Sequence, residues 1–155
     1  HPNDRQRIIR ALEVCQSTGR PFTWWHSNAM STPLCAGPLL TLNATLEWLE
    51  PRLARRLDLM LELGALDEAR AAMNTCADPA APGWSGIGCA EALAHLQGRL
   101  SAQDGRQQWL HNTRAYAKRQ LTWFRARPEA VWLPPDKPLA VVEAAQRFWQ
   151  SVRQP

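Results

Sequence analysis

The 155-residue chain has the size of a single domain, and its 45% of apolar residues suffices for a hydrophobic core. Charged residues make up only 21% and are of mixed sign, which excludes a disordered, strongly charged tail. The formal net charge of +4 permits nucleic-acid binding without demonstrating it, and no apolar run predicts a membrane-spanning helix or a signal peptide.

The first predicted element is a helix over about residues 4–18, which Asn3 or Asp4 can cap and Gly19 can end. Its apolar side is formed by Ile8, Ile9, Leu12 and Val14. Residues 20–38 are rich in Ser, Pro and Trp and are predicted to form a loop.

A short strand is predicted over residues 38–42, followed by a helix from about Thr45 to Leu63 that stops at Gly64. The apolar side chains of this helix recur at helical spacing: Leu46, Leu49, Leu53, Leu57 and Met60. Pro51 fits only in the first turn or at a late helix start, because a proline inside a helix removes a hydrogen bond.

Four further helices are predicted, separated by a Pro/Gly-rich loop at residues 77–86 and a short apolar segment at 130–133. Ser101 and Asp104 resemble a capping box at the start of the longest of them. The terminal segment, residues 139–155, is expected to be helical. The four helices cover about residues 66–74, 89–97, 101–126 and 138–152.

This order of elements predicts a mainly α-helical domain with one or two short strands. Since isolated strands need partners, the other strands of the sheet are expected elsewhere, and the first residue, His1, also favours a fragment. The cysteines at positions 15, 35, 76 and 89 are widely spaced without a CxxC pair. They are therefore predicted to be reduced cytosolic thiols and not zinc ligands.

The long helix is expected to carry most of the positive charge. Residues 101–128 hold six Lys and Arg side chains against one acid, Asp104, which gives a local net charge of +5. On a helical wheel, the apolar residues form one broad arc, and Arg119 lies on the opposite flank from a basic stripe. The stripe consists of Arg114, Lys118, Arg125 and His111.

An ordinary amphipathic helix with a solvated basic face is the alternative interpretation, and two features argue against it. Acids that could form pairs within the helix are almost absent. Thr113 and Gln120 also fall within the apolar arc, where a polar group without a partner costs about 1–3 kcal/mol. Their partners are expected to come from the protein or from a substrate.

Residues 113–125 read TRAYAKRQLTWFR, which resembles almost letter for letter the TRqYAKRQ-TW-R signature of the tRNA dimethylallyltransferase (tRNA isopentenyltransferase) family. Three other segments agree with family motifs in order and spacing: HPNDRQRIIRALEVCQSTGR at 1–20, RLARRLDLMLELG at 52–64 and GIGCAE at 86–91. The resemblance extends from His1 to about Leu133 and identifies residues 1–155 as the C-terminal half of such an enzyme, without its N-terminal phosphate-loop part.

The resemblance implies the C-terminal part of an α/β, P-loop kinase-like transferase fold, for which nucleotide or ATP binding is typical. The family transfers a dimethylallyl group from its diphosphate to N6 of adenosine 37 in tRNA and grips the anticodon stem-loop. The implied partners are therefore tRNA and dimethylallyl diphosphate, with Mg²⁺ as cofactor at a site outside this chain. A cytoplasmic protein, monomeric at full length and without membrane contact, is expected.

Site residues follow from the same resemblance. Arg56 matches the arginine expected near the substrate diphosphate, with Arg52 as a weaker candidate; an arginine fork suits phosphate oxygens. No catalytic or metal-binding residue is expected in this chain. The residues that match the tRNA-contacting segments are Gln6, Arg7, Arg10, Gly88, Arg114, Lys118, Arg119, Gln120, Thr122, Trp123 and Arg125.

The residues themselves leave structural alternatives open. Arg56 can be a surface arginine whose stem covers apolar surface. The arginines of the first helix can pair with Asp4 and Glu13 on a plain surface helix, and Gln120 can satisfy a neighbouring helix. Trp123 is predicted to be a core residue in preference to a stacking platform.

The sequence departs from the family at the turn over residues 86–91. Cys89 stands where tyrosine is usual and Ala90 where a basic residue is usual, which predicts weakened tRNA contacts there. The motif G-x-x-x-x-G-K-[ST], which cradles phosphates, is absent: the two lysines, Lys118 and Lys137, do not follow a glycine.

Three hypotheses follow from these observations. The chain is part of a tRNA dimethylallyltransferase and transfers no prenyl group by itself. Alternatively, it is a stand-alone, non-catalytic RNA-binding module, or a helical interaction protein whose affinity for tRNA does not exceed that for other polyanions. The salt dependence and selectivity of tRNA binding distinguish these hypotheses.

Overall fold

The computed structural model describes residues 3–29 and 37–153, in two compact units that cover residues 1–37 and 38–155. The first unit contains α1 (Arg5–Thr18) and α2 (Phe22–Asn28). The second contains β1 (Leu39–Leu42), α3 (Leu46–Glu62), α4 (Ala65–Thr75), the 3-10 helix η1 (Pro82–Ser85), α5 (Cys89–Leu96), α6 (Ala102–Arg125), β2 (Ala130–Leu133) and α7 (Pro138–Arg153).

Helix α1 has the ends that the sequence predicts. The side chain of Asp4 accepts a hydrogen bond from the backbone N–H of Arg7, and Gly19 ends the helix in the left-handed conformation at φ 68°. The loop predicted for residues 20–38 is wrong where α2 forms. That helix is held by an edge contact between the Phe22 and His26 rings, one helical turn apart, which composition alone did not reveal. Residues 30–36 of the predicted loop lie outside the described residues.

The strands β1 and β2 pair with each other in parallel, from Leu39 opposite Ala130 to Leu42 opposite Leu133. Both strands were predicted, and each is the other's partner. The expectation that further strands of the sheet lie elsewhere stays a prediction. Within the described residues the sheet has these two strands alone. A parallel pair needs a long crossover, and here the crossover contains α3 to α6.

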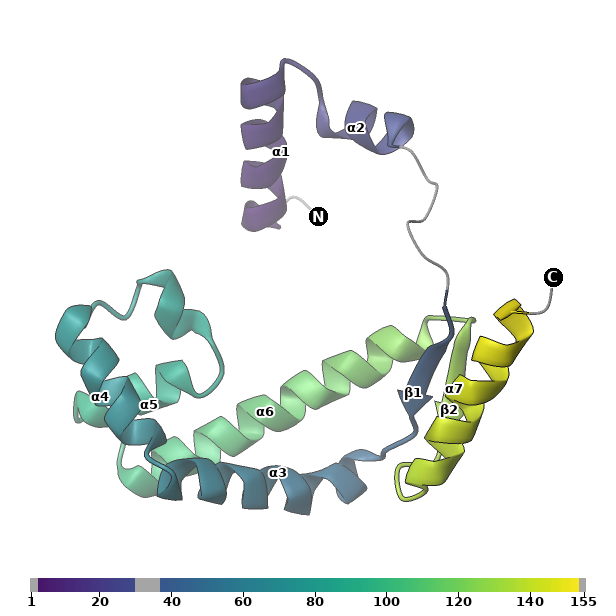
Figure 1. Cartoon of the computed structure of the whole chain (residues 1–155). Coiled ribbons are helices and arrows are strands. Elements are labelled where there is room, and N and C mark those ends of the chain that lie inside the picture. The colour runs from purple at the N-terminus through teal and green to yellow at the C-terminus, as the bar shows by residue number, and fades with distance from the viewer. Residues whose placement is uncertain (1–2, 30–36, 154–155) are drawn as a thin grey trace. The chain divides into compact units, whose positions relative to one another are not determined.

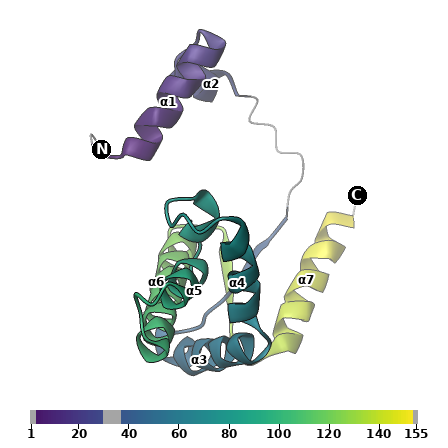
Figure 2. The same cartoon turned by 90° about the vertical axis from the view of Figure 1, so that its left-hand side faces the viewer.

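Helices α3 and α6 form the frame of the second unit and lie side by side (Figure 1). Helices α4 and α5 with η1 pack at one end of this pair, and β1, β2 and α7 lie at the other. In the turned view of Figure 2, α7 again stands apart from α4 and α5. The buried core of the unit lies mainly in α5, where Leu93 is 1% exposed, together with Leu57 and Trp84.

Helix α3 has nearly the predicted bounds, but Pro51 lies in its second turn, so neither of the two predicted places for Pro51, the first turn or a late helix start, is correct. Thr45 caps the helix by accepting a hydrogen bond from the backbone N–H of Trp48, and the helix runs without a break to Glu62. Proline removes one backbone donor, but packing of α3 against α6 and the buried side chain of Leu57 maintain the helix.

The long helix α6 begins as a capping arrangement predicts, because Ser101 accepts from the backbone N–H of Asp104 at 3.0 Å and donates to its carboxylate. Together these elements form the mainly helical domain with two short strands that the sequence predicts. No helix in the described part of the chain is long and apolar enough to span a membrane.

Candidate functional site

A groove of about 500 Å³ is lined by α3, by α6 and by the turn before α5. Its walls combine two arginines with aromatic and apolar side chains. Arg56 and Met60 come from α3, Ile87 from the turn, and Thr113, Tyr116 and Arg119 from α6. A groove with this lining can hold a ligand that carries both negative charge and apolar or planar groups.

The two arginines of the groove differ from the other arginines of these helices. The exposed side chain of Arg56 makes no ion pair or hydrogen bond with any described residue. The guanidinium of Arg119 lies 5.5 Å from the ring centroid of Tyr116, a cation–π distance that leaves its N–H donors available. Both guanidinium groups can therefore offer paired donors to phosphate oxygens.

Two further cations of α6, Lys118 and Arg125, are exposed and have no ion pair or hydrogen bond through their side chains with any described residue. Beyond the helix end, the guanidinium of Arg127 lies 4.2 Å from the ring centroid of Trp123. The prediction that Trp123 is a core residue is wrong in this chain, because its side chain is 51% exposed. An exposed indole beside free cations is the combination that stacks on bases of single-stranded RNA.

Partners from the protein or from a substrate were expected for Thr113 and Gln120, and Thr113 has one from the protein. The hydroxyl of Thr113 donates to the carbonyl of Trp109 one turn earlier at 2.8 Å, and Gln120 is exposed to solvent. Thr122 likewise donates to the carbonyl of Lys118 at 3.0 Å. The helical wheel misplaced Gln120 because α6 is covered on only part of its apolar arc.

The acids that balance α6 come from the neighbouring helix α3, which the sequence analysis did not predict. Arg106 donates two hydrogen bonds to Asp58, at 2.6 and 2.8 Å, and Arg114 donates one to Glu50 at 3.0 Å. The two pairs are eight residues apart on each helix and run in opposite order, so α3 and α6 are antiparallel.

The hydrogen bonds from Arg106 lower the pKa of the Asp58 carboxyl below its usual value, although partial burial acts in the opposite direction. The same hydrogen bonds raise the pKa of Arg106. Both groups therefore stay charged at neutral pH and tie α3 to α6 beside a small cavity that Arg106 lines.

The free energy of unfolding should depend on pH in the acidic range because of Asp58. Because its pKa is lower in the folded state, the pair stabilises the fold above the ordinary aspartate pKa of about 3.9 and loses this contribution as the pH falls further. In Asp58→Asn, the free energy of unfolding should decline less between about pH 4.5 and pH 2, measured by urea unfolding at each pH. Arg106→Gln should likewise weaken the dependence of the free energy of unfolding on pH in this range. If both variants kept the pH dependence of the wild-type protein, this role of the pair would be excluded.

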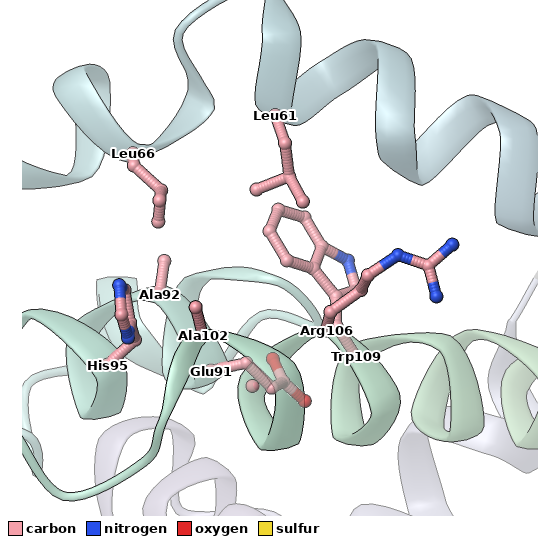
Figure 3. Close-up of a pocket in the computed structure, with 9 residues that line it drawn as sticks. Leu61, Leu66, Glu91, Ala92, His95, Ala102, Arg106 and Trp109 are labelled. Atoms are coloured by element: carbon pink, nitrogen blue, oxygen red, sulfur yellow. The ribbon is translucent and has the colours of Figure 1, made fainter.

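The turn Gly86–Glu91 is organised by a buried carboxylate. Glu91 is 5% exposed, accepts the backbone N–H of Gly88 at 2.6 Å and also accepts from the side-chain amide of Asn112 on α6. In Figure 3, Glu91 lies with Ala92 and His95 of α5 on one side of a small cavity, and Leu61 of α3 points toward the indole of Trp109. Glu91 and Asn112 were not predicted from the sequence, although the G-x-x-E spacing is a helix-start signal that indicates Glu91.

Gly88 itself is buried and adopts φ 95° directly against the Trp109 ring. The tight turn with close backbone approach that the sequence predicts is therefore present. A contact between Gly88 and tRNA stays a prediction. The departures at Cys89 and Ala90 lie beside it, and both side chains are exposed.

The predicted tRNA-contacting residues of α1 belong to the first unit, and all three are exposed. Arg7 pairs with Asp4 at 3.1 Å and Arg10 with Glu13 at 3.3 Å, as the alternative interpretation of a surface helix predicts. Gln6 makes no side-chain hydrogen bond with a described residue. Exposed pairs of this kind contribute about 0–1 kcal/mol, so a phosphate can replace the carboxylate at small cost.

The cysteines and acidic residues of the described part form no metal centre. Cys15, Cys76 and Cys89 are free and exposed, while Cys35 lies outside the described residues. No group of three or more His, Cys, Asp or Glu side chains that could hold a metal ion occurs in residues 3–29 and 37–153.

Comparison with known proteins identifies the relatives of this chain. The family model described as IPP transferase matches residues 1–127. The chain is 73% identical over 145 residues to a tRNA dimethylallyltransferase of Desulfovibrio desulfuricans, covering 94% of this chain and 45% of the relative. It is 61% identical over 136 residues to a tRNA dimethylallyltransferase of Nitratidesulfovibrio vulgaris, covering 88% of this chain and 44% of the relative.

Solved structures agree with these relatives. The full-length tRNA isopentenylpyrophosphate transferase of Bacillus halodurans has 28% identity and a TM-score of 0.68, with 99% of this chain and 47% of that chain covered. The corresponding transferase of Staphylococcus epidermidis, at 24% identity and a TM-score of 0.67, supports the fold. The chain thus spans less than half the length of the two curated relatives described above.

Proposed function

Because the chain belongs to the IPP transferase family, we propose that it forms the tRNA-binding half of a tRNA dimethylallyltransferase. The observation that carries this proposal is a set of cations, in and beside one groove, that form no ion pair with any described residue. Arg56 and Arg119 line the groove, and Lys118 and Arg125 extend the positive charge along α6. The substrates would be tRNA, at adenosine 37 of the anticodon stem-loop, and dimethylallyl diphosphate.

In the proposed reaction, N6 of the adenosine attacks the first carbon of the dimethylallyl group. The bond between that carbon and the diphosphate oxygen breaks, the diphosphate leaves with the electron pair, and N6 releases one proton. Arg56 and Arg119 can donate hydrogen bonds to the leaving diphosphate as its charge grows. The base that accepts the proton is proposed to lie outside this chain, together with the phosphate loop and the bound Mg²⁺ and nucleotide phosphates typical of the fold.

The family resemblance implies Mg²⁺ as cofactor, and we propose that it binds outside this chain. When bound, Mg²⁺ neutralises charge on a departing diphosphate. The contribution of this chain is to bind and orient: its cations hold phosphates, and its exposed Trp123 offers a planar surface to an unstacked base.

Binding of tRNA should fall steeply with salt, because each phosphate that a cation neutralises releases counterions. Lys118→Gln should lower the slope of log affinity against log salt by about 0.7–0.9. Lys137→Gln is the matched control, since Lys137 is an exposed lysine outside α6. The measurement is fluorescence anisotropy of labelled tRNA, with heparin as competitor.

Equal slopes for the Lys118 variant and the wild-type protein would contradict the proposed surface on α6. If the affinity for tRNA did not exceed that for heparin, a helical interaction protein would be the better interpretation. The protein expressed from the longest reading frame that contains this chain could also bind tRNA selectively and yet transfer no prenyl group. That result would favour a stand-alone RNA-binding module in which the cations of α6 bind RNA without catalysis.

A further inference from the structure

Arg114 differs from the other cations of α6 in the segment that resembles the family's RNA-contacting motif. Its guanidinium is bonded to Glu50 of α3 at 3.0 Å, whereas Lys118 and Arg125 have no acidic partner among the described residues. Arg114 and Glu50 are partly exposed, at 43% and 50% of their side-chain area. Arg114 can therefore reach an RNA phosphate only in competition with a carboxylate that lies beside it.

The position of Glu50 is fixed by the helices and not by a mobile side chain alone. The antiparallel packing of α3 and α6 that joins Glu50 to Arg114 also joins Asp58 to Arg106, two turns further along. A second carboxylate, Glu47, lies in the first turn of α3. Hydrogen bonds from its own backbone N–H and from Thr45 lower the pKa of Glu47, and the charge of Arg114 lowers it further. The acidic start of α3 thus faces Arg114 and keeps that guanidinium paired.

A paired arginine and a free one contribute differently to RNA binding. The pair carries no net charge, so a phosphate that approaches it releases few counterions, whereas a free lysine gives the full electrostatic gain. An exposed pair is weak, which means that the carboxylate attenuates binding and does not abolish it. This inference depends on the proposed tRNA-binding function.

We propose that Glu50 holds Arg114 out of the set of cations that bind tRNA phosphates, and thereby limits the affinity and the salt dependence of tRNA binding. The resemblance to the family assigns Arg114 to the RNA surface together with Lys118. The geometry instead makes Arg114 a tie between α3 and α6, with Glu50 as the residue that controls its availability.

The test uses the protein expressed from the longest reading frame that contains this chain, with labelled tRNA over a series of salt concentrations. Glu50→Gln should raise the affinity roughly threefold to tenfold and steepen the salt slope by about 0.7–0.9, because Arg114 becomes available. Arg114→Gln alone should leave the slope unchanged, and in the double variant the gain from Glu50→Gln should disappear. Thermal unfolding of each variant verifies that these substitutions at partly exposed positions leave the protein folded.

Glu62→Gln is the matched control, since Glu62 is an exposed acid on the same helix without a described partner. It removes the same charge and should leave the salt slope unchanged. The proposal is overturned if Glu50→Gln changes the slope no more than Glu62→Gln, or if Arg114→Gln lowers it as much as Lys118→Gln. In both cases the response to Lys118→Gln would keep the proposed function intact. If the wild-type protein showed no selective tRNA binding, the proposed function would fail and this proposal with it.

Discussion

Replacing Gly88 with alanine is expected to lower the free energy of unfolding by roughly 2–5 kcal/mol, from left-handed strain and overpacking together. Gly88 adopts φ 95°, a conformation that L side chains rarely adopt. An added Cβ would also lie 2.4 Å from Cζ2 and 2.5 Å from Cε2 of the Trp109 ring. The Trp109 ring, which lines both the groove and the small cavity of Figure 3, would have to shift to make room for this Cβ.

Gly98 provides the matched control for this substitution. It also has a positive φ, 71°, but nothing lies within 4 Å of an added Cβ. Gly98→Ala should therefore cost only about 1–2 kcal/mol from backbone strain. Urea unfolding followed by circular dichroism measures both variants. Equal losses would show that the Trp109 ring yields, and that the close approach at Gly88 does not stabilise the fold.

Arg56→Gln is expected to lower kcat/KM for prenyl transfer roughly 100- to 1000-fold, the usual loss when one donor to a developing anion is removed. Arg56 lines the groove, and no described residue neutralises its charge, so its guanidinium is available to the diphosphate. Because the side chain is exposed, the midpoint of thermal unfolding should change little. The measurement is steady-state transfer of labelled dimethylallyl groups to tRNA by the protein from the longest reading frame.

Arg55 allows the effect of position to be separated from the effect of charge. It is the neighbouring residue on α3, exposed and likewise without a described partner, but it does not line the groove. Arg55→Gln should leave kcat/KM within about threefold of the wild-type value, as expected for a solvent-screened charge outside the groove. Similar losses for both variants would show that Arg56 acts only through the general field of the helix.

The sequence predicted most helices of the fold because their boundaries have local chemical signals. Asp4 and Ser101 cap helices through their own side chains, and Gly19 adopts the left-handed conformation that ends α1. Helix α2 was missed because its support is a contact between the Phe22 and His26 rings, whereas its composition resembles a loop. The bounds of α3 were predicted, but the place of Pro51 in its second turn was not, because packing against α6 outweighs one lost hydrogen bond.

The sequence predicted which residues belong to the candidate site, but it did not predict how they are arranged in space. Resemblance placed Arg56 and Arg119 on two different helices, but only the antiparallel packing of α3 and α6 brings them to one groove. The same packing pairs Arg114 with Glu50, 64 residues away in the sequence. Pairings at this sequence distance leave no periodic signal within either helix, which explains why the acids seemed absent. The exposure of Trp123 could not be predicted from the helical wheel, since the wheel does not show which part of the apolar arc a neighbour covers.

According to the proposed function, this chain supplies the binding half of a tRNA-prenylating enzyme and needs further residues for chemistry. The most direct test is to incubate tRNA and labelled dimethylallyl diphosphate with Mg²⁺ and either the 155-residue chain or the protein from the longest reading frame that contains it. We predict labelled tRNA only with the longer protein, because the chain lacks a G-x-x-x-x-G-K-[ST] loop. Turnover by the 155-residue chain alone, or no turnover by a longer protein that carries such a loop, would contradict this account.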